Sequence, residues 1–424
     1  MAPSTATDTL DRAQELFEEG RPESALNMVD KLYGQALTSS ERGRALALQA
    51  VCLEQLDRGD EAERLVAKVM EEEGDDLAFV LAAGIAFSDF DAFVHAEIFL
   101  RNLCELDPEN HMAWYNLAIS LGREGRYPES VQMYDECIQR DAAFADAYFQ
   151  KGYCFALMGD LDRAAATYRA YLEREPGDAE AWKTLGIVES DRREPDAAYA
   201  AFEKAASIGG DDPVDVYFNW AITAARANDL ERVEACIEEM EASDPEGWRT
   251  LLTKADYEEA QEQVWPAWEI LCEAFDAVLE DKEDLGTCGY VAAGLIRFAT
   301  RHDMSVHVGE YVERIFEEGL YSEDVLRALQ SLDGRLSNAV KSHQVVLKAA
   351  PVNDEDEPDG ARFVVYGVSA EDAAEAGELA LEFEAKYGPC AWEVHSLQQI
   401  TGPDEGHVGI YWRSEEMDRP PAAR

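Results

Sequence analysis

The stretch WYNLAISLGREGRYPESVQMYDECIQRDAAFADA covers residues 114–147, and YFQKGYCFALMGDLDRAAATYRAYLEREPGDAEA follows over residues 148–181. A third stretch begins with WKTLGIVESDRREPDAAYAAF at residues 182–202. Aromatic residues open all three, at Trp114, Tyr148 and Trp182, and the steps 148 − 114 and 182 − 148 are both 34 residues. Self-similarity at one fixed period of this size indicates stacked supersecondary units rather than a single compact core.

Small and aromatic residues recur in the same phase inside each stretch. Three sets show this: Ala118, Gly152 and Gly186; Ser130, Ala164 and Ala198; and Tyr134, Tyr168 and Phe202. The phase continues upstream to about residue 8 and downstream to residue 247, with a displacement of one residue at Gly209-Gly210. About seven units are therefore predicted over residues 8–247.

One unit carries a recognisable pattern: an aromatic residue, Leu-Gly three positions on, and then Ala followed by Phe. Its residues are Trp182, Leu185, Gly186, Ala198 and Phe202. In this pattern the chain resembles the tetratricopeptide repeat (TPR) family over more than half of its length. The resemblance implies a mainly α fold, a right-handed α-solenoid of about seven TPR helical hairpins. Its small residues would let helix axes approach closely, and its aromatic residues would fill the space between hairpins.

The period fades after residue 247, but helical patterns continue. Apolar residues at Val264, Trp268, Leu271 and Phe275 are spaced 4, 3 and 4 residues apart and predict a helix over residues 256–280. Residues 248–341 are interpreted as additional helical hairpins that cap the open end of the solenoid.

The last part of the chain, residues 342–424, reads as a small α+β module. Strands are predicted at residues 345–347, 363–368, 392–396 and 407–412, with a helix at 370–387, which gives the order ββαββ. No family is recognised in this module.

The charge balance is extreme, because 37 Lys and Arg stand against 88 Asp and Glu, a formal net charge of −51. Such a field repels phosphate backbones and anionic lipids, so neither nucleic acid nor a membrane is expected as a partner. Two explanations stay open. The acidity attracts a basic partner, or it is a bacterial or archaeal halophile-like adaptation to salt, which the low share of lysine (10 of the 37 cations) favours.

The eight cysteines are scattered without a C-x-x-C pair, which speaks against a zinc ribbon or a dithiol redox motif. Residues 1–16 lack the apolar core of a signal peptide, and no run of about 18 apolar residues occurs. Unpaired cysteines suit a reducing compartment, so a cytoplasmic location is predicted.

The resemblance to the TPR family also implies a concave groove lined by the first helix of each hairpin, at positions 2, 5, 9, 12 and 13 of each unit. Aromatic and apolar residues with a few cations at these positions would accept a peptide or helix of a protein partner. The predicted peptide-binding groove consists of Tyr115, Ile119, Arg123, Phe149, Tyr153, Leu157, Lys183, Phe218, Ile222 and Arg226. The alternative for some of them is simple burial between helices.

Chaperone-binding members of the family clamp a terminal carboxylate with cations and asparagines on successive first helices. Here only Lys183 and Asn219 fit that role, and the carboxylates of Asp146 and Glu180 would repel the ligand. The carboxylate clamp is therefore not expected.

No catalytic, cofactor-binding or metal-binding residue is predicted. The chain contains no G-x-x-x-x-G-K-[ST], G-x-G-x-x-G, H-E-x-x-H or G-x-S-x-G motif. The best alternative lies in the C-terminal module, where a hairpin joining residues 391–400 to 407–412 would bring Glu393, His395 and His407 together. Imidazole and carboxylate groups could bind a metal or transfer protons.

The leading hypothesis is a non-catalytic scaffold or adaptor that binds a protein segment in the groove and needs no cofactor. One alternative is an enzyme or ligand sensor in the C-terminal module, with the repeats as a targeting arm. Another is a chaperone-like assembly factor with several clients.

Overall fold

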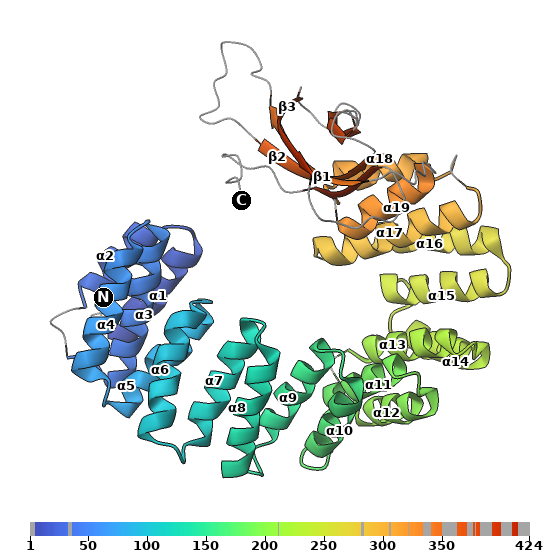
Figure 1. Ribbon diagram of the computed structural model, residues 1–424. Coiled ribbons are helices and arrows are strands. Elements are labelled where there is room, and N and C mark those ends of the chain that lie inside the picture. Colours follow the sequence, from blue (N-terminus) through green and yellow to red (C-terminus); the bar gives the residue numbers. More distant parts are fainter. Residues whose placement is uncertain are drawn as a thin grey trace. The chain divides into compact units, whose positions relative to one another are not determined.

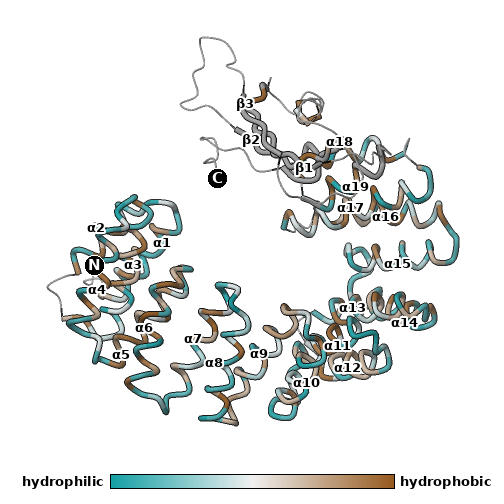
Figure 2. Tube along the Cα trace, viewed as in Figure 1, coloured by the Kyte–Doolittle hydropathy of each residue, from teal (hydrophilic) through white to brown (hydrophobic). Residues whose placement is uncertain are grey.

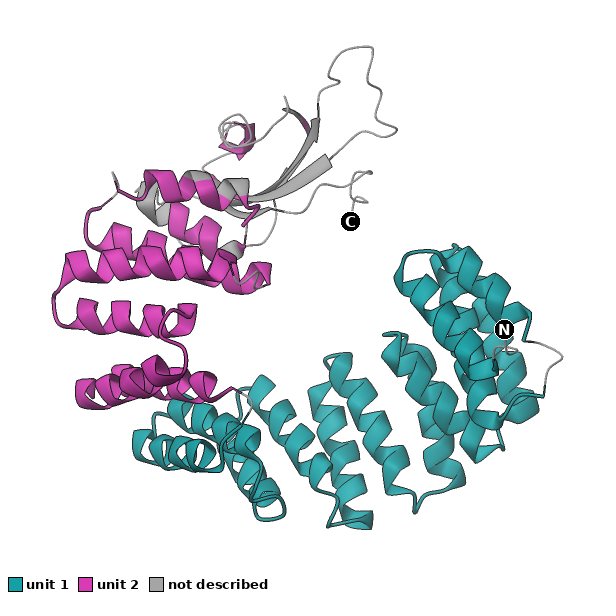
Figure 3. Ribbon diagram, turned by 180° about the vertical axis from the view of Figure 1, so that it is seen from behind, with its two compact units in different colours: residues 1–211 teal, residues 212–424 magenta. Residues whose placement is uncertain are grey.

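The computed structural model describes residues 5–32, 36–210, 212–280, 284–304, 307–320, 322–333, 341–349, 363–370, 376–377, 379–381, 392–399 and 409–413. Its helices and strands are labelled in Figure 1. The chain divides into two compact units, residues 1–211 (unit 1) and residues 212–424 (unit 2), coloured separately in Figure 3. Each unit is described by itself.

Unit 1 is a series of antiparallel helix pairs in which the odd-numbered helix comes first. The bounds are α1 Ala6–Glu18, α2 Pro22–Asp30, α3 Ser39–Gln55, α4 Gly59–Glu73, α5 Leu77–Asp89, α6 Phe93–Leu106, α7 His111–Arg123, α8 Tyr127–Arg140, α9 Ala145–Leu157, α10 Leu161–Leu172, α11 Ala179–Asp191 and α12 Pro195–Ile208. Figure 2 shows how apolar and polar residues are distributed along these helices. Amphipathic helices such as α4 bury one stripe, whereas α5 is apolar over most of its length.

The turns inside the hairpins share one backbone feature. Shortly after the end of the first helix, one residue has a left-handed φ. In the third of these turns Gly125 has φ 82°, and the N–H of Arg126 donates back to Leu121 O at 2.9 Å. This bond satisfies a carbonyl that the helix end would otherwise leave unpaired. The turn residues spaced 34 apart are Asp57, Asp91, Gly125, Gly159 and Arg193.

The repeated small residues lie against the repeated aromatic rings, as predicted. A Cβ on Gly186 would lie 2.7 Å from the ring of Phe202, and a Cβ on Gly152 would lie 3.1 Å from the ring of Tyr168. Both rings are fully buried. The hairpin α11–α12 therefore has no room for a side chain at position 186.

We expect Gly186→Ala to lower the free energy of unfolding by about 1–2 kcal/mol, since overpacking of a core costs about 1–3 kcal/mol and alanine returns up to about 1 kcal/mol of helix propensity. Gly152→Ala meets less crowding and should stay within about 0.5 kcal/mol of the wild type. Urea denaturation followed by circular dichroism checks both variants. Equal effects at the two positions would contradict the geometry.

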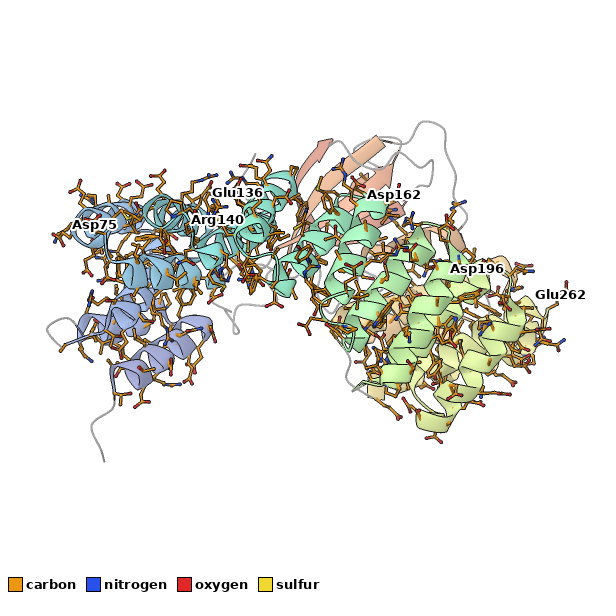
Figure 4. All side chains as sticks on the ribbon, turned by 90° about the horizontal axis from the view of Figure 1, so that it is seen from below. Asp75, Glu136, Arg140, Asp162, Asp196 and Glu262 are labelled. Atoms are coloured by element: carbon orange, nitrogen blue, oxygen red, sulfur yellow. The ribbon has the colours of Figure 1, made fainter. Side chains whose placement is uncertain are left out.

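A stacked arginine joins the two ends of the hairpin α7–α8. The guanidinium of Arg140 lies 4.4 Å from the ring centroid of Trp114 and donates to the carbonyl of Pro108. Trp114 Nε1 donates to the same carbonyl at 3.0 Å. Figure 4 labels Arg140 beside Glu136, with which it forms an ion pair at 2.7 Å. We call this arrangement of arginine, aromatic ring and preceding turn the arginine clip.

The next hairpin repeats the arginine clip, but the one after it does not. Arg174 lies 3.8 Å from the ring centroid of Tyr148, and its Nε donates to Ala142 O at 2.9 Å. In the hairpin α11–α12 the aromatic residue is Trp182, and the position that corresponds to the arginine holds Ile208, an exposed apolar residue. Each clip contributes about 0.5–1 kcal/mol from the cation–π contact alone.

Unit 1 also buries one carboxylate. Glu189 on α11 is 1% exposed, accepts a hydrogen bond from Arg169 on α10, and pairs with Arg192 at 2.5 Å. Arg192 pairs in addition with Asp162 at 2.7 Å. The buried charge of Glu189 is thus neutralised by two guanidinium groups from different segments.

Unit 2 continues with helices and then a sheet. Its helices are α13 Pro213–Arg226, α14 Leu230–Ser243, α15 Trp248–Ala260, α16 Val264–Glu280, α17 Leu285–Arg301, α18 Gly309–Glu317 and α19 Glu323–Asp333. One core cluster joins α15, α16 and α17 with residues of α18 and α19, and Phe275 at its centre is fully buried.

The single helix predicted over residues 256–280 is wrong, because α15 ends at Ala260 and α16 begins at Val264. Glu262 between them has a left-handed φ of 64°. Pro266 explains where the second helix begins, since proline lacks an N–H and fits the first turn of a helix but not its interior.

The strands of unit 2 form one antiparallel sheet in the order β3-β1-β2-β4. Their bounds are β1 Lys341–Ala349, β2 Phe363–Ala370, β3 Trp392–Gln399 and β4 Gly409–Arg413. Leu326 of α19 packs with Val368 and Ala370 of β2 and with Ala376 and Ala380, which are helical. The rest of the helix predicted at 370–387 lies outside the described residues.

The hairpin predicted between the last two strands is wrong. β3 pairs with β1 and β4 pairs with β2, so the two strands form opposite edges of the sheet. The hairpin fails because each of the two strands finds its hydrogen-bonding partner in a strand from earlier in the chain. Glu393 and His395 lie on β3, whereas His407 lies outside the described residues.

The predicted mainly helical fold of paired helices is confirmed. The predicted boundaries at residues 247 and 341 stay predictions.

Candidate functional site

The predicted groove residues lie in both units. Tyr115, Ile119 and Arg123 lie on α7, Phe149, Tyr153 and Leu157 on α9, and Lys183 on α11, all in unit 1. Phe218, Ile222 and Arg226 lie on α13 in unit 2. The ten positions therefore belong to two surfaces, one in each unit.

Two of the predicted aromatic residues pack between hairpins. Tyr115 is half-buried, with its ring 4.9 Å from that of Phe144, and burial raises the pKa of its hydroxyl. Phe149 is also half-buried and lies 5.3 Å from the ring of Tyr171. Both side chains are thus partly buried between helices, as the alternative interpretation predicts. The same holds for Ile119, which is half-buried as well.

Tyr153 and Leu157 differ from these because they are open to solvent. Tyr153 is 51% exposed and Leu157 is 46% exposed, and they lie one helical turn apart on α9. Met158 next to them is also exposed and was not predicted. These three residues form an apolar patch, which we call the α9 patch.

The two predicted cations of unit 1 already have partners within the chain. Arg123 donates to Ser88 O at 3.1 Å and lies 3.5 Å from Asp89. Lys183 pairs with Glu180 at 2.6 Å. A partner on this face would therefore meet mainly apolar and aromatic groups.

The two residues that fit the carboxylate clamp each form contacts within their own helix. Lys183 is held by Glu180, and Asn219 Nδ2 donates to Asp215 O at 2.7 Å within α13. Both side chains thus form contacts within their own helices.

In unit 2, Phe218 and Ile222 line a small hollow. The ring of Phe218 lies 5.7 Å from that of Trp248, and Arg226 is exposed at the end of α13. Two adjoining pockets of about 40 and 130 Å³ share the lining residues Leu252, Asp256 and Tyr290. We call them together the unit 2 hollow.

The unit 2 hollow contains residues that the sequence analysis missed. Asp256 lines both pockets, and burial raises the pKa of its carboxyl to about 6, with Glu259 adding to the rise and Arg301 opposing it. Tyr290, Gly294 and Arg297 of α17 line the same hollow. Their spacing of 4 and 3 residues places them on one helix face, a signal readable in the sequence once α17 is recognised.

A further pocket, of about 180 Å³, lies among the first helices α1, α3 and α5 of unit 1. Its lining is mostly apolar, and the one cation, Arg44, pairs with Asp11 at 2.8 Å. None of the predicted groove residues lines this pocket.

The surface of the described helices is strongly acidic. Figure 4 labels four exposed carboxylates, of Asp75, Asp162 and Asp196 in unit 1 and of Glu262 in unit 2. Among the described residues, no group of three or more His, Cys, Asp or Glu is arranged to hold a metal ion. In the same part of the chain, no helix combines the length and apolar character that a membrane crossing requires.

Comparisons with known proteins agree with the repeat. A family model described as tetratricopeptide repeat matches residues 10–78, 115–179 and 157–213. A curated relative, the cell division cycle protein 27 homolog of Caenorhabditis elegans, is 27% identical over 100 residues. The match covers 24% of this chain and spans only 13% of that protein's length.

Several solved structures share part of the course of the chain. YrrB, titled a TPR protein with an unusual peptide-binding site, is 19% identical with a TM-score of 0.38 and covers 45% of this chain and 97% of its own. The APC/C hetero-tetramer Cut9-Hcn1 is 15% identical with a TM-score of 0.37 and covers 63% and 52%. Pseudomonas aeruginosa pilF is 16% identical with a TM-score of 0.36 and covers 53% and 99%.

The 34-residue period, the paired helices with their left-handed turns, and the family match lead to one conclusion. Residues 10–78 and 115–213 of this chain are tetratricopeptide repeats.

Proposed function

We propose that the chain is a non-catalytic scaffold or adaptor that binds a segment of another protein on the face of α7, α9 and α11. Tetratricopeptide repeats generally mediate contacts between proteins, and stacked repeats present extended binding surfaces. The observation that carries the proposal is the α9 patch, because large apolar side chains gathered in the open mark interaction sites.

The α9 patch suits an apolar stripe on the partner. A partner helix would place side chains one turn apart against Tyr153 and Leu157, which are themselves one turn apart. Tyrosine is favoured in such contacts because its ring buries a large area while its hydroxyl stays hydrated.

The charge and the cysteines support the remaining parts of the proposal. A net charge of −51 disfavours nucleic acid and anionic membranes as partners. All seven cysteines in the described part of the chain are buried thiols, and burial raises the pKa of several, Cys137 and Cys272 to about 11. Such inert thiols suit a reducing compartment, so we propose a cytoplasmic location.

The double variant Tyr153→Ala, Leu157→Ala tests the α9 patch. Because truncation of a central interface residue costs about 2 kcal/mol and about 1.4 kcal/mol is tenfold in affinity, we expect capture of the partner to fall at least tenfold. The measurement is quantitative mass spectrometry of proteins captured from native lysate, with helicity checked by circular dichroism.

A matched control uses another exposed apolar pair of unit 1 with the same spacing. Val94 is 67% exposed and Ile98 is 44% exposed, both on α6. The variant Val94→Ala, Ile98→Ala should leave capture unchanged. If both double variants reduce capture equally, or neither does, the α9 patch is not the binding site.

A further inference from the structure

A glycine in the middle of α17 leaves space in the unit 2 hollow. Glycine inside a helix costs about 0.5–1 kcal/mol relative to alanine, so it calls for a reason. Gly289 has one, because a Cβ there would lie 2.8 Å from Ser322 Oγ. At Gly294, by contrast, a Cβ would meet no described atom within 4 Å. No described residue of the chain fills that space.

Arg297 lies one turn beyond Gly294 and lines the same hollow while half-buried. Its neighbour Arg301 binds Glu259 through two hydrogen bonds of 3.0 and 2.8 Å. Arg297 has no such bond or ion pair with any residue that the structure describes. In a chain with 88 carboxylates and 37 cations this is unusual, since a partly buried guanidinium is stabilised by an anion.

The smaller pocket of the hollow is largely apolar, whereas the larger one also has the charged residues Asp256 and Arg301 in its lining. Tyr290 is 48% exposed and lies one turn before Gly294, and Leu252 contributes to both pockets. An open space, an aromatic ring and an unpaired guanidinium therefore follow each other along one helix face.

We propose that the unit 2 hollow is a second binding site, which takes a protein segment with a single carboxylate next to an apolar residue: the carboxylate pairs with Arg297, and the apolar side chain fills the space at Gly294 and packs on Tyr290. This site is separate from the α9 patch and does not depend on it. A basic segment fits less well, because Arg297 is a half-buried cation that forms no ion pair with any described residue.

Three capped decapeptides probe the site on the full-length chain. Each carries a fluorophenylalanine in a Gly-Ser background, and two residues further on it carries Glu, Gln or Lys. Fluorine NMR titration measures weak binding directly. We expect the Glu peptide to bind about tenfold more tightly than the Gln peptide, which is the size of effect that one charge-assisted hydrogen bond gives.

Two variants connect the preference to the structure. Arg297→Gln should abolish the preference for Glu over Gln, whereas Arg193→Gln, the same change at an exposed arginine of unit 1, should preserve it. Gly294→Leu should weaken binding of the Glu and Gln peptides at least fivefold, because leucine fills the space. Leucine also raises helix propensity, so α17 should keep its fold.

Equal binding of the Glu and Gln peptides would overturn the proposal, and so would tighter binding of the Lys peptide or no binding of any peptide. A preference that survives Arg297→Gln would overturn it as well. The variant Tyr153→Ala, Leu157→Ala should bind the Glu peptide normally, so failure of this site and failure of the α9 patch are distinguishable.

Discussion

Replacing both Arg169 and Arg192 with methionine is expected to destabilise the hairpin α11–α12 by about 3–5 kcal/mol, the range for breaking a buried ion pair from one side. The change leaves the carboxylate of Glu189, which is 1% exposed, without a compensating charge. Methionine keeps the apolar packing of the arginine stems, so the loss reports on the charge. Hydrogen exchange of the α10 and α11 amides in the full-length chain measures the local free energy of opening.

A triple variant that adds Glu189→Leu is the control. Replacing all members of a buried ionic cluster by apolar residues is often neutral, so stability should return to within about 1–2 kcal/mol of the wild type. If the double variant loses less than about 1 kcal/mol, solvent reaches Glu189 and the two arginines are not what stabilises it.

Phe275→Ala is expected to destabilise unit 2 by about 3–5 kcal/mol, because it removes a fully buried ring and leaves a cavity. The ring of Phe275 lies 6.1 Å from that of Tyr311, and the guanidinium of Arg314 lies 5.3 Å from its centroid. The change therefore also loosens α18 from α16. Hydrogen exchange should accelerate in α15 to α18.

The same measurement shows whether the loss stays local. Contacts gather within residues 1–211 and within 212–424, so exchange in α1 to α10 should not change. Phe275→Leu keeps most of the volume and should cost less than about 1.5 kcal/mol. Equal acceleration in both units would mean that the chain opens as one cooperative structure.

The repeat was predictable because its contacts join residues that are close together in the sequence. A small residue at position 152 or 186 and a ring sixteen residues later meet within one hairpin, so sequence spacing alone places them in contact. The strand order was not predictable in the same way. Pairing of β3 with β1 joins residues 343–349 to 392–399, and nothing in either stretch specifies the other.

The candidate surfaces could be predicted only in part. Position counting placed Phe149 and Tyr153 equally in the groove, but Tyr171 of the second helix covers part of Phe149 and leaves Tyr153 open. Side-chain exposure depends on packing that the repeat pattern does not encode. Gly294 and Arg297 were missed because the family pattern had faded by α17, although their spacing was visible.

The arginine clip bears on how a chain of this kind changes length during evolution. Since the arginine, the ring and the preceding turn recur with the 34-residue period, a duplicated repeat carries its own clip into the new copy. Ile208 ends this series just before residues 209–212, where the chain passes from one compact unit to the next. An insertion at this junction therefore separates no arginine of a clip from its ring.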